Sequence, residues 1–232
     1  VYLMTIQQHV KENTYILDHI IAEFLSSSDK NKIEGIQWYK TAHMVAAQMS
    51  ETFNIKLIKV VGVIAALSPN NHWDKNIIDA ESLIAAYNSG MSYDQIFDDV
   101  KVSTFNPNKR KALNVLFDQG RTNVDNKISI EELIKPKKES GHKVLSFFNC
   151  IFAYNNTIDV CIDGHALSIY LGERITVNSS RSNMTPKQYA HIQEAYRLAT
   201  NKINEITKDK REYIPMEIQA ITWLAYRERH NL

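Results

Sequence analysis

The chain has 232 residues, 44% of them hydrophobic and 23% charged, a composition that excludes a wholly disordered protein. Its 27 Lys and Arg residues against 26 Asp and Glu residues give a net charge of +1, so overall charge makes no case for nucleic acid. The two cysteines, Cys150 and Cys161, lack the spacing of an iron–sulfur or zinc site and indicate a reducing compartment. With neither a membrane span nor a signal peptide in the sequence, we expect a cytoplasmic protein. We also expect that it needs no cofactor and no metal.

Apolar residues at helical spacing and a scarcity of glycine predict an all-α protein. The length suits one large domain over residues 1–232 or two small lobes that share a cleft. The β-branched run 59–68 (KVVGVIAALS) suits a buried strand or a buried helix, and we expect a helix. Over 76–88, apolar positions recur on one face and predict an amphipathic helix. Ser129, with Glu132 three residues later, predicts a helix that begins with a capping box.

Two further helices are predicted in the C-terminal third of the chain. One follows Thr185 and begins at Pro186, running to about residue 206, and the other begins at Pro215 and runs to about residue 229. Four segments rich in Ser, Asn or Asp are expected to be loops: 26–32, 103–108, 120–127 and 176–185.

Two short segments concentrate positive charge. Residues 135–143 (KPKKESGHK) hold four lysines against one glutamate, and Lys109, Arg110 and Lys111 form a second cluster. Lysines grouped in this way are typical of phosphate contacts, so we expect Lys109 and Lys111 to contact a nucleic acid backbone.

The stretch 140–174 combines a glycine turn with a carboxylate. Gly141 lies ahead of an apolar helix, where unpaired backbone amides and the helix dipole favour a bound phosphate. Asp163 lies ahead of another helix, predicted from about residue 166 to 171, whose dipole favours an ionised carboxylate. Asp163 would then act as a base or stabilise a developing positive charge, or it would only cap the helix.

This stretch resembles the helix-hairpin-helix motif and catalytic loop of the endonuclease III and 8-oxoguanine DNA glycosylase superfamily. There, a G-x-K hairpin is followed by D-x-H, and the matching positions are Gly141, Lys143, Asp163 and His165. The resemblance implies that Lys143 attacks the anomeric carbon of the sugar and that Asp163 assists departure of the base. Gly141, His142 and His165 would contact DNA.

Segments further upstream extend the resemblance. Residues 64–73 (IAALSPNNHW) are similar to the superfamily segment that fills the hole left by an extruded base, where Asn70, Asn71 and His72 would insert and Trp73 could stack on a base. Residues 108–116 resemble the helix that follows. The chain also has a terminal QA-TW-R pattern at 219–227. With these segments and this pattern it is similar to phage and bacterial proteins thought to act on hypermodified DNA.

The resemblance implies a two-lobed helical bundle with a central cleft, whose hairpin and catalytic loop occupy residues 135–172. We expect a monomer, not bound to a membrane, that flips a modified base out of double-stranded DNA. The expected activity is that of a DNA glycosylase, with or without lyase activity. It would remove a hydroxymethylated or glucosylated pyrimidine and leave an abasic site, in anti-phage defence or phage DNA metabolism.

Other functions fit the same residues. The chain could be a transferase that hypermodifies hydroxymethylpyrimidine in phage DNA, with Lys143 holding a leaving phosphate. It could also be a non-catalytic DNA-binding module, in which Lys143 is only a phosphate contact. Taken singly, His165 would orient its loop by hydrogen bonding and not bind a metal. Trp38, Trp73 and Trp223 would be core or groove-lining aromatics.

Overall fold

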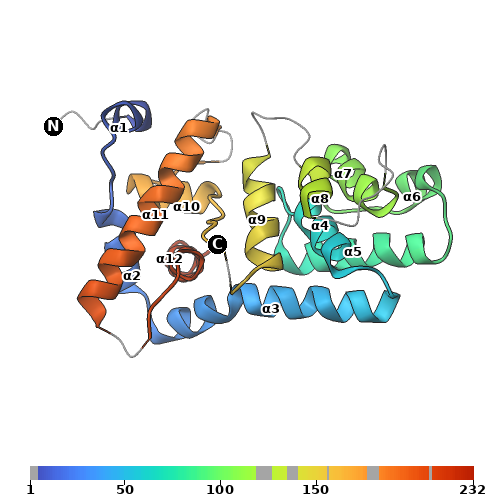
Figure 1. Ribbon diagram of the computed structural model, residues 1–232, viewed down its shortest axis with the longest axis horizontal. Helices are drawn as coiled ribbons and strands as arrows, with labels where there is room; N and C mark the ends of the chain where they lie inside the picture. Colours follow the sequence, from blue (N-terminus) through green and yellow to red (C-terminus); the bar gives the residue numbers. More distant parts are fainter. Residues whose placement is uncertain (1–4, 119–126, 135–140, 156, 177–182, 209–210) are drawn as a thin grey trace. The chain divides into compact units, whose positions relative to one another are not determined.

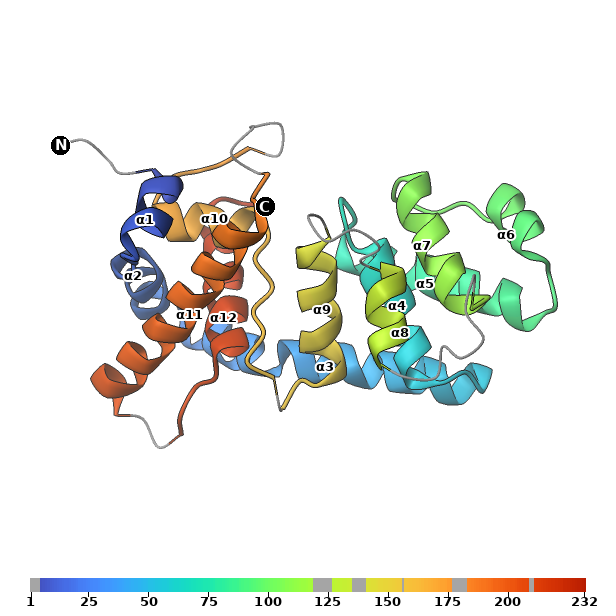
Figure 2. The same cartoon turned by 45° about the horizontal axis from the view of Figure 1, so that its top comes forward.

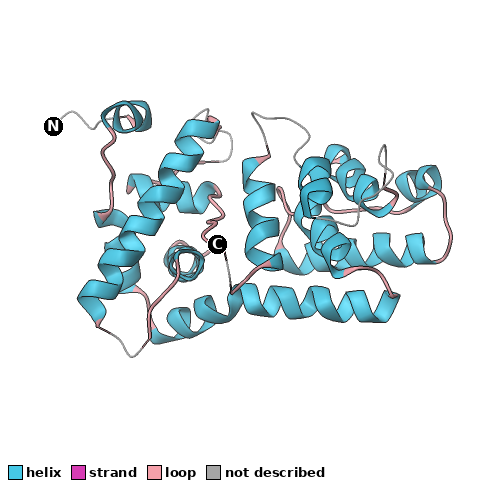
Figure 3. Cartoon of the chain, viewed as in Figure 1, coloured by secondary structure: helices cyan, strands magenta, loops and turns pink. Residues whose placement is uncertain are grey.

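The computed structural model describes residues 5–118, 127–134, 141–155, 157–176, 183–208 and 211–232, and these form helices joined by loops (Figure 1). No strand occurs in these ranges (Figure 3), so the predicted all-α class is confirmed. The chain divides into two compact units: unit 1 comprises Val1–Tyr39 and Asn155–Leu232, and unit 2 comprises Lys40–Tyr154. Unit 2 is therefore inserted, in sequence, between the two parts of unit 1.

Unit 2 is built around helix α4. Every residue of α4 from Lys59 to Leu67 is buried, and a helix that is apolar on all sides is typical of a protein interior. The other helices of the unit form around it, and α5, α7, α8 and α9 all contact it. The helices lying within unit 2 are α4 (Leu57–Leu67), α5 (Trp73–Asn88), α6 (Tyr93–Asp99), α7 (Asn106–Leu116), α8 (Lys127–Ile134) and α9 (His142–Phe152).

Two features of α4 allow its neighbours to approach closely. A Cβ added at Gly62 would lie 2.9 Å from Cγ2 of Ile130 and 3.1 Å from Cγ1 of Val115, so glycine allows α7 and α8 to pack against this turn. Lys59 is buried, and its Nζ lies 2.6 Å from Oδ1 of Asp118, which follows α7. This ion pair neutralises a charge that burial would otherwise strongly disfavour.

Unit 1 brings the N-terminal helices together with the last three helices of the chain (Figure 2). α2 contacts α10, α11 and α12, and α1 contacts α11. Ile20 and Phe24 of α2 pack in one apolar core with Tyr170, Tyr196 and Tyr226, which come from α10, α11 and α12. The helices are α1 (Ile6–Glu12), α2 (Asp18–Ser26), α10 (Gly164–Leu171), α11 (Pro186–Thr207) and α12 (Pro215–Arg229); α3 (Asp29–Phe53) contains the boundary between the units.

Several predicted helices are confirmed. The ambiguous run 59–68 falls within α4 and its C-cap, and the amphipathic segment 76–88 belongs to α5. α11 and α12 begin at the two prolines that predicted them. At α11 the reason is local, because Oγ1 of Thr185 accepts from the amide of Gln188 at 3.3 Å while Oε1 of Gln188 accepts from the amide of Thr185 at 2.9 Å.

Three predictions about helix ends are wrong. The expected loop 103–108 overlaps α7, which begins at Asn106. α8 begins at Lys127, so Ser129 lies inside the helix and is not its N-cap residue. Most of the expected loop 26–32 is helical, because α2 continues to Ser26 and α3 begins at Asp29. Among the described helices, none combines the length and the apolar character needed to cross a bilayer.

Candidate functional site

Asp163 is the N-cap residue of α10. Its Oδ1 accepts hydrogen bonds from the backbone amides of His165 at 3.0 Å and Ala166 at 2.8 Å. These amides and the positive end of the helix dipole both stabilise a negative charge at this position. The prediction that Asp163 lies at the mouth of a helix is confirmed, and α10 begins at Gly164, two residues before the predicted start.

The second oxygen of Asp163 is held from α12. The indole Nε1–H of Trp223 donates to Oδ2 of Asp163 over 2.9 Å, so both carboxylate oxygens accept hydrogen bonds. The three N–H donors fix the orientation of the carboxylate and occupy three of its roughly four lone-pair sites. A carboxylate held in this way is in a fixed position for stabilising a positive charge, which is one of the two chemical roles expected for Asp163.

Aromatic side chains surround Trp223. The His165 ring lies 6.2 Å from the Trp223 ring and 5.5 Å from that of Tyr226, between ring centroids. The Trp38 ring meets Trp223 edge to face at 6.2 Å, and the guanidinium of Arg227 lies 4.5 Å from the Trp223 centroid. The surroundings of Asp163 therefore combine flat apolar surface with hydrogen-bond donors.

A buried tyrosine supports the first turn of α10. The hydroxyl of Tyr196 donates to the carbonyl of Ala166 at 3.3 Å. Burial raises the pKa of Tyr196, and the charges of Asp163 and Glu23 raise it further against an opposing hydrogen bond with Thr222. The phenol therefore stays protonated and keeps donating to the helix whose amides hold Asp163.

Lys143 lies in the first turn of α9, in unit 2. Gly141 is the N-cap residue of that helix, with φ +82° in the left-handed region, and no side chain caps the helix there. His142 and Lys143 are the first two helical residues, which is the setting expected for a phosphate contact. Residues 135–140, with the other lysines of the basic segment, lie outside the described residues. Lys143 and Asp163 belong to different units, so their joint action stays a prediction.

The segment predicted to insert into DNA is anchored within unit 2. The side-chain Nδ2 of Asn71 donates to Oδ2 of the buried Asp79 at 2.9 Å, and the backbone amide of Ser103 donates to the same oxygen at 2.8 Å. The hydroxyl of Thr104 donates to the carbonyl of Pro69 at 2.7 Å. Two loops that are distant in sequence are thereby fixed to one another.

The side chains of this segment differ in what they can reach. Asn70 and His72 are exposed, and Asn70 has a left-handed backbone with φ +54°. Asn71 is directed toward Asp79, and Trp73 contacts Phe147 edge to face at 6.5 Å. Asn70 and His72 are therefore the two of these residues best placed to meet a partner.

Lys109 has a structural position. It is buried, and its Nζ donates to the carbonyls of Phe97 and Val100, at the C-terminal end of α6. Burial lowers the pKa of Lys109, against the raising effect of Asp98 and Asp99, and burial also lowers the pKa of the half-buried Lys111. The amine of Lys109 caps the C-terminal end of α6 by donating to these carbonyls. This position gives no support to the predicted phosphate contact at Lys109.

Unit 1 also contains a pocket of about 530 Å³ between α2 and the C-terminal ends of α10 and α12. Nδ1 of His19 donates to the carbonyl of Tyr170 at 3.0 Å, and Glu23 pairs with Arg229. The pocket lies at the end of α10 opposite Asp163. Within the described ranges, no group of three or more His, Cys, Asp or Glu side chains is placed to hold a metal ion.

The fold and this site together define an all-helical protein with a fixed, N-capping carboxylate supported by a tryptophan. The chain belongs to the family of unknown function DUF7178, whose match covers residues 4–230. No curated protein matches the chain, and no solved structure matches it.

Proposed function

We propose that the protein is a DNA glycosylase that removes a modified pyrimidine from double-stranded DNA and leaves an abasic site. The observation that carries this proposal is the hydrogen bonding of Asp163, whose carboxylate is held by two amides of α10 and by Trp223. Cleavage of a glycosidic bond develops positive charge on the sugar as the base departs. A carboxylate already fixed in position stabilises that charge without reorganising during the reaction.

The resemblance in sequence supplies the other roles of the proposal. Lys143, at the start of α9, would attack the sugar or hold a phosphate at the amides that follow Gly141. Asn70 and His72, both exposed, would occupy the space that the extruded base leaves. A helix-hairpin-helix motif and a central cleft are parts of the same proposal.

Treatment of defined duplexes tests the activity. Purified protein is incubated with duplexes that carry glucosylated, hydroxymethylated or unmodified pyrimidines, and alkali-labile sites are counted. We expect sites in a modified duplex, and a rate about 100-fold lower for Asp163→Asn, the scale of a lost electrostatic contact. Asp18→Asn, which changes an exposed carboxylate in the first turn of α2, should keep the wild-type rate. Intact duplexes of every kind would reject the proposal, as would full activity of Asp163→Asn.

The role of Lys143 has a separate test. Borohydride reduces a Schiff base between a lysine and the sugar to a stable adduct, so trapping should fix the protein to DNA and fail in Lys143→Ala. Abasic sites that accumulate without any adduct would reject the nucleophilic role of Lys143. The glycosylase proposal would then continue with water as the attacking group.

A second candidate is a non-catalytic DNA-binding module. One observation favours it: the two hydrogen bonds that Asp163 accepts from backbone amides are those of an ordinary N-cap, which needs no chemical role. Salt-dependent binding of duplex DNA without product, unchanged in Asp163→Asn, would support this candidate against the glycosylase.

A further inference from the structure

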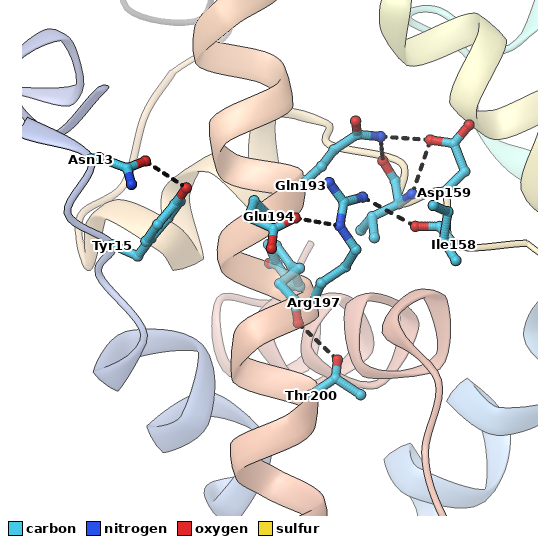
Figure 4. Close-up of polar contacts among 10 residues, drawn as sticks. Asn13, Tyr15, Ile158, Asp159, Gln193, Glu194, Arg197 and Thr200 are labelled. Atoms are coloured by element: carbon cyan, nitrogen blue, oxygen red, sulfur yellow. Dashed lines mark hydrogen bonds and ion pairs between the residues drawn. The ribbon is translucent and has the colours of Figure 1, made fainter. Parts of the chain in front are cut away.

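Side chains of α11 form hydrogen bonds with the backbone of the extended segment 158–162, which leads directly to Asp163. Figure 4 shows Gln193 and Arg197 reaching from the helix toward this segment. The three side chains involved are spaced four residues apart on one face of α11: Tyr189, Gln193 and Arg197.

The bonds follow a regular order along both elements. The hydroxyl of Tyr189 accepts from the amide of Ile162 at 3.0 Å and lies 3.4 Å from the carbonyl of Val160, to which it donates. Nε2 of Gln193 donates to the same carbonyl at 2.8 Å. Further along the helix, Nη1 of Arg197 donates to the carbonyl of Ile158 at 3.2 Å. As residue numbers rise along α11 they fall along the segment, so the two run antiparallel.

The spacing of these contacts has a geometric reason. Four residues of an α-helix advance about 6.0 Å along its axis. Two residues of extended chain advance about 6.6 Å, so side chains one turn apart on a helix can meet alternate residues of an extended segment. The backbone of the segment therefore finds its hydrogen-bond partners in the side chains of Tyr189, Gln193 and Arg197, where in a sheet it would find them in a neighbouring strand.

This arrangement satisfies backbone groups in an apolar interior. Val160, Cys161 and Ile162 are buried, and the described residues of the chain include no strand that could pair with them. An unpaired buried amide or carbonyl destabilises the folded state, so the side chains of α11 keep the segment extended and in register. The next residue after Ile162 is Asp163, whose direction is set by this segment.

We infer that Tyr189 and Gln193 are positioning residues for Asp163, acting through the backbone of 160–162. This inference rests on the proposed function, since it makes the two side chains necessary for the charge-stabilising role of Asp163. Three elements then fix the carboxylate: α10 through its amides, α12 through Trp223, and α11 through the segment that precedes it.

The same helix provides a matched control. Asn204 of α11 bonds the backbone of a second extended segment, since its Oδ1 accepts from the amide of Tyr213 at 2.9 Å and its Nδ2 donates to the carbonyl of Tyr213 at 3.0 Å. Asn204→Leu therefore removes contacts of the same kind from the segment that precedes α12, ahead of Trp223 in the sequence, and leaves the segment that ends at Asp163 intact. Tyr189→Phe and Gln193→Met remove the contacts to 160–162 and keep most of the side-chain volume.

Two measurements on these variants test the inference. The first is the single-turnover rate of base release, compared with the dissociation constant for the same duplex. Tyr189→Phe and Gln193→Met should slow release about tenfold or more and leave the dissociation constant unchanged, because a displaced catalytic group affects the reaction and not the grip on DNA. Asn204→Leu should lower the melting temperature to a similar degree and keep the wild-type rate.

The second measurement does not depend on activity. The indole N–H resonance of Trp223 reports the position of Asp163, and it should shift in Tyr189→Phe and Gln193→Met but not in Asn204→Leu. If wild-type protein acts on no duplex, the proposed function fails while this resonance still tests the positioning. An unchanged Trp223 resonance in both α11 variants would overturn the inference, and so would equal slowing by Asn204→Leu.

Discussion

The indole of Trp223 and the carboxylate of Asp163 are joined by a 2.9 Å hydrogen bond across 60 residues of sequence. The bond connects α12 to the N-terminal end of α10. Because Oδ1 of Asp163 accepts the hydrogen bonds from the amides of α10, Oδ2 is the oxygen that accepts from the indole. A carboxylate can accept on both sides at once, which an amide side chain cannot do.

This geometry predicts a specific coupling between Asp163 and Trp223. In Asp163→Asn the single oxygen should face the amides of α10, which turns the NH₂ group toward the indole N–H. Two donors then face each other, and the free energy of unfolding should fall by about 1–3 kcal/mol. Adding Trp223→Phe removes the opposing donor and should recover part of the loss. Urea denaturation of the two single variants and the double variant measures the coupling, and strictly additive losses would contradict it.

Lys109 should matter for stability and not for DNA affinity. In Lys109→Met the carbonyls of Phe97 and Val100 lose their donor, and the free energy of unfolding should fall by about 1–3 kcal/mol. Lys101→Met, at an exposed lysine, is the control for stability. Fluorescence anisotropy with labelled duplex at several salt concentrations measures affinity. A salt dependence weakened by about one ion in Lys109→Met would restore the phosphate contact that the sequence predicted.

His191 should make stability depend on pH. Burial lowers the pKa of His191 from its ordinary value of 6.5; the charge of His9 adds to this effect, and a backbone hydrogen bond at Thr14 opposes it. The ring stacks on Tyr15 with centroids 4.4 Å apart and meets Tyr170 edge to face. As the pH falls below about 6.5, the unfolded chain takes up a proton that the folded chain excludes, so stability decreases with acidification.

Replacement of His191 separates this contribution from other titrating groups. His191→Phe keeps a flat ring against Tyr15 and removes the proton site. Urea denaturation at several values between pH 7.5 and 5 should therefore show a smaller loss of stability on acidification in the variant than in the wild type. Equal losses in the two proteins would assign the pH dependence to other groups.

Two glycines at the ends of α10 should respond oppositely to substitution by alanine. Gly172 has φ +68°, and a Cβ there would lie 2.5 Å from Cε1 of His19, so Gly172→Ala should lose about 1–2 kcal/mol or more. A Cβ at Gly164 would meet no atom within 4 Å, and Gly164→Ala should be neutral or stabilise by up to about 1 kcal/mol. Thermal denaturation compares the two, and a stable Gly172→Ala protein would contradict the left-handed turn.

Local signals predicted the helices well where a few neighbouring residues decide the outcome. Pro186 and Pro215 mark the starts of α11 and α12, and the capping position of Asp163 follows from its own side chain and the next two amides. Ser129 misled because a capping sequence is only one possible start, and α8 begins a little earlier at Lys127.

Contacts between distant residues could not be predicted in the same way. Nothing local distinguishes Lys109 from a surface lysine, since its burial depends on how α7 packs against the end of α6. The sequence predicts Trp223 only as a core or groove-lining aromatic, because its bond to Asp163 depends on the packing of α12. The four-residue spacing of Tyr189 and Gln193 was the available signal for the α11 contacts, but their target, an isolated extended segment, has no sequence signature of its own.

The insertion of unit 2 into the sequence of unit 1 affects the order in which the chain can fold during translation. Ile20 and Phe24 of α2 become fully buried only against helices that are made after the whole of unit 2. Unit 2 is a single continuous stretch and can fold as soon as it emerges, whereas the N-terminal helices must wait with apolar surface exposed. During translation α1 and α2 therefore reach their native partners only after the whole of unit 2 has been made.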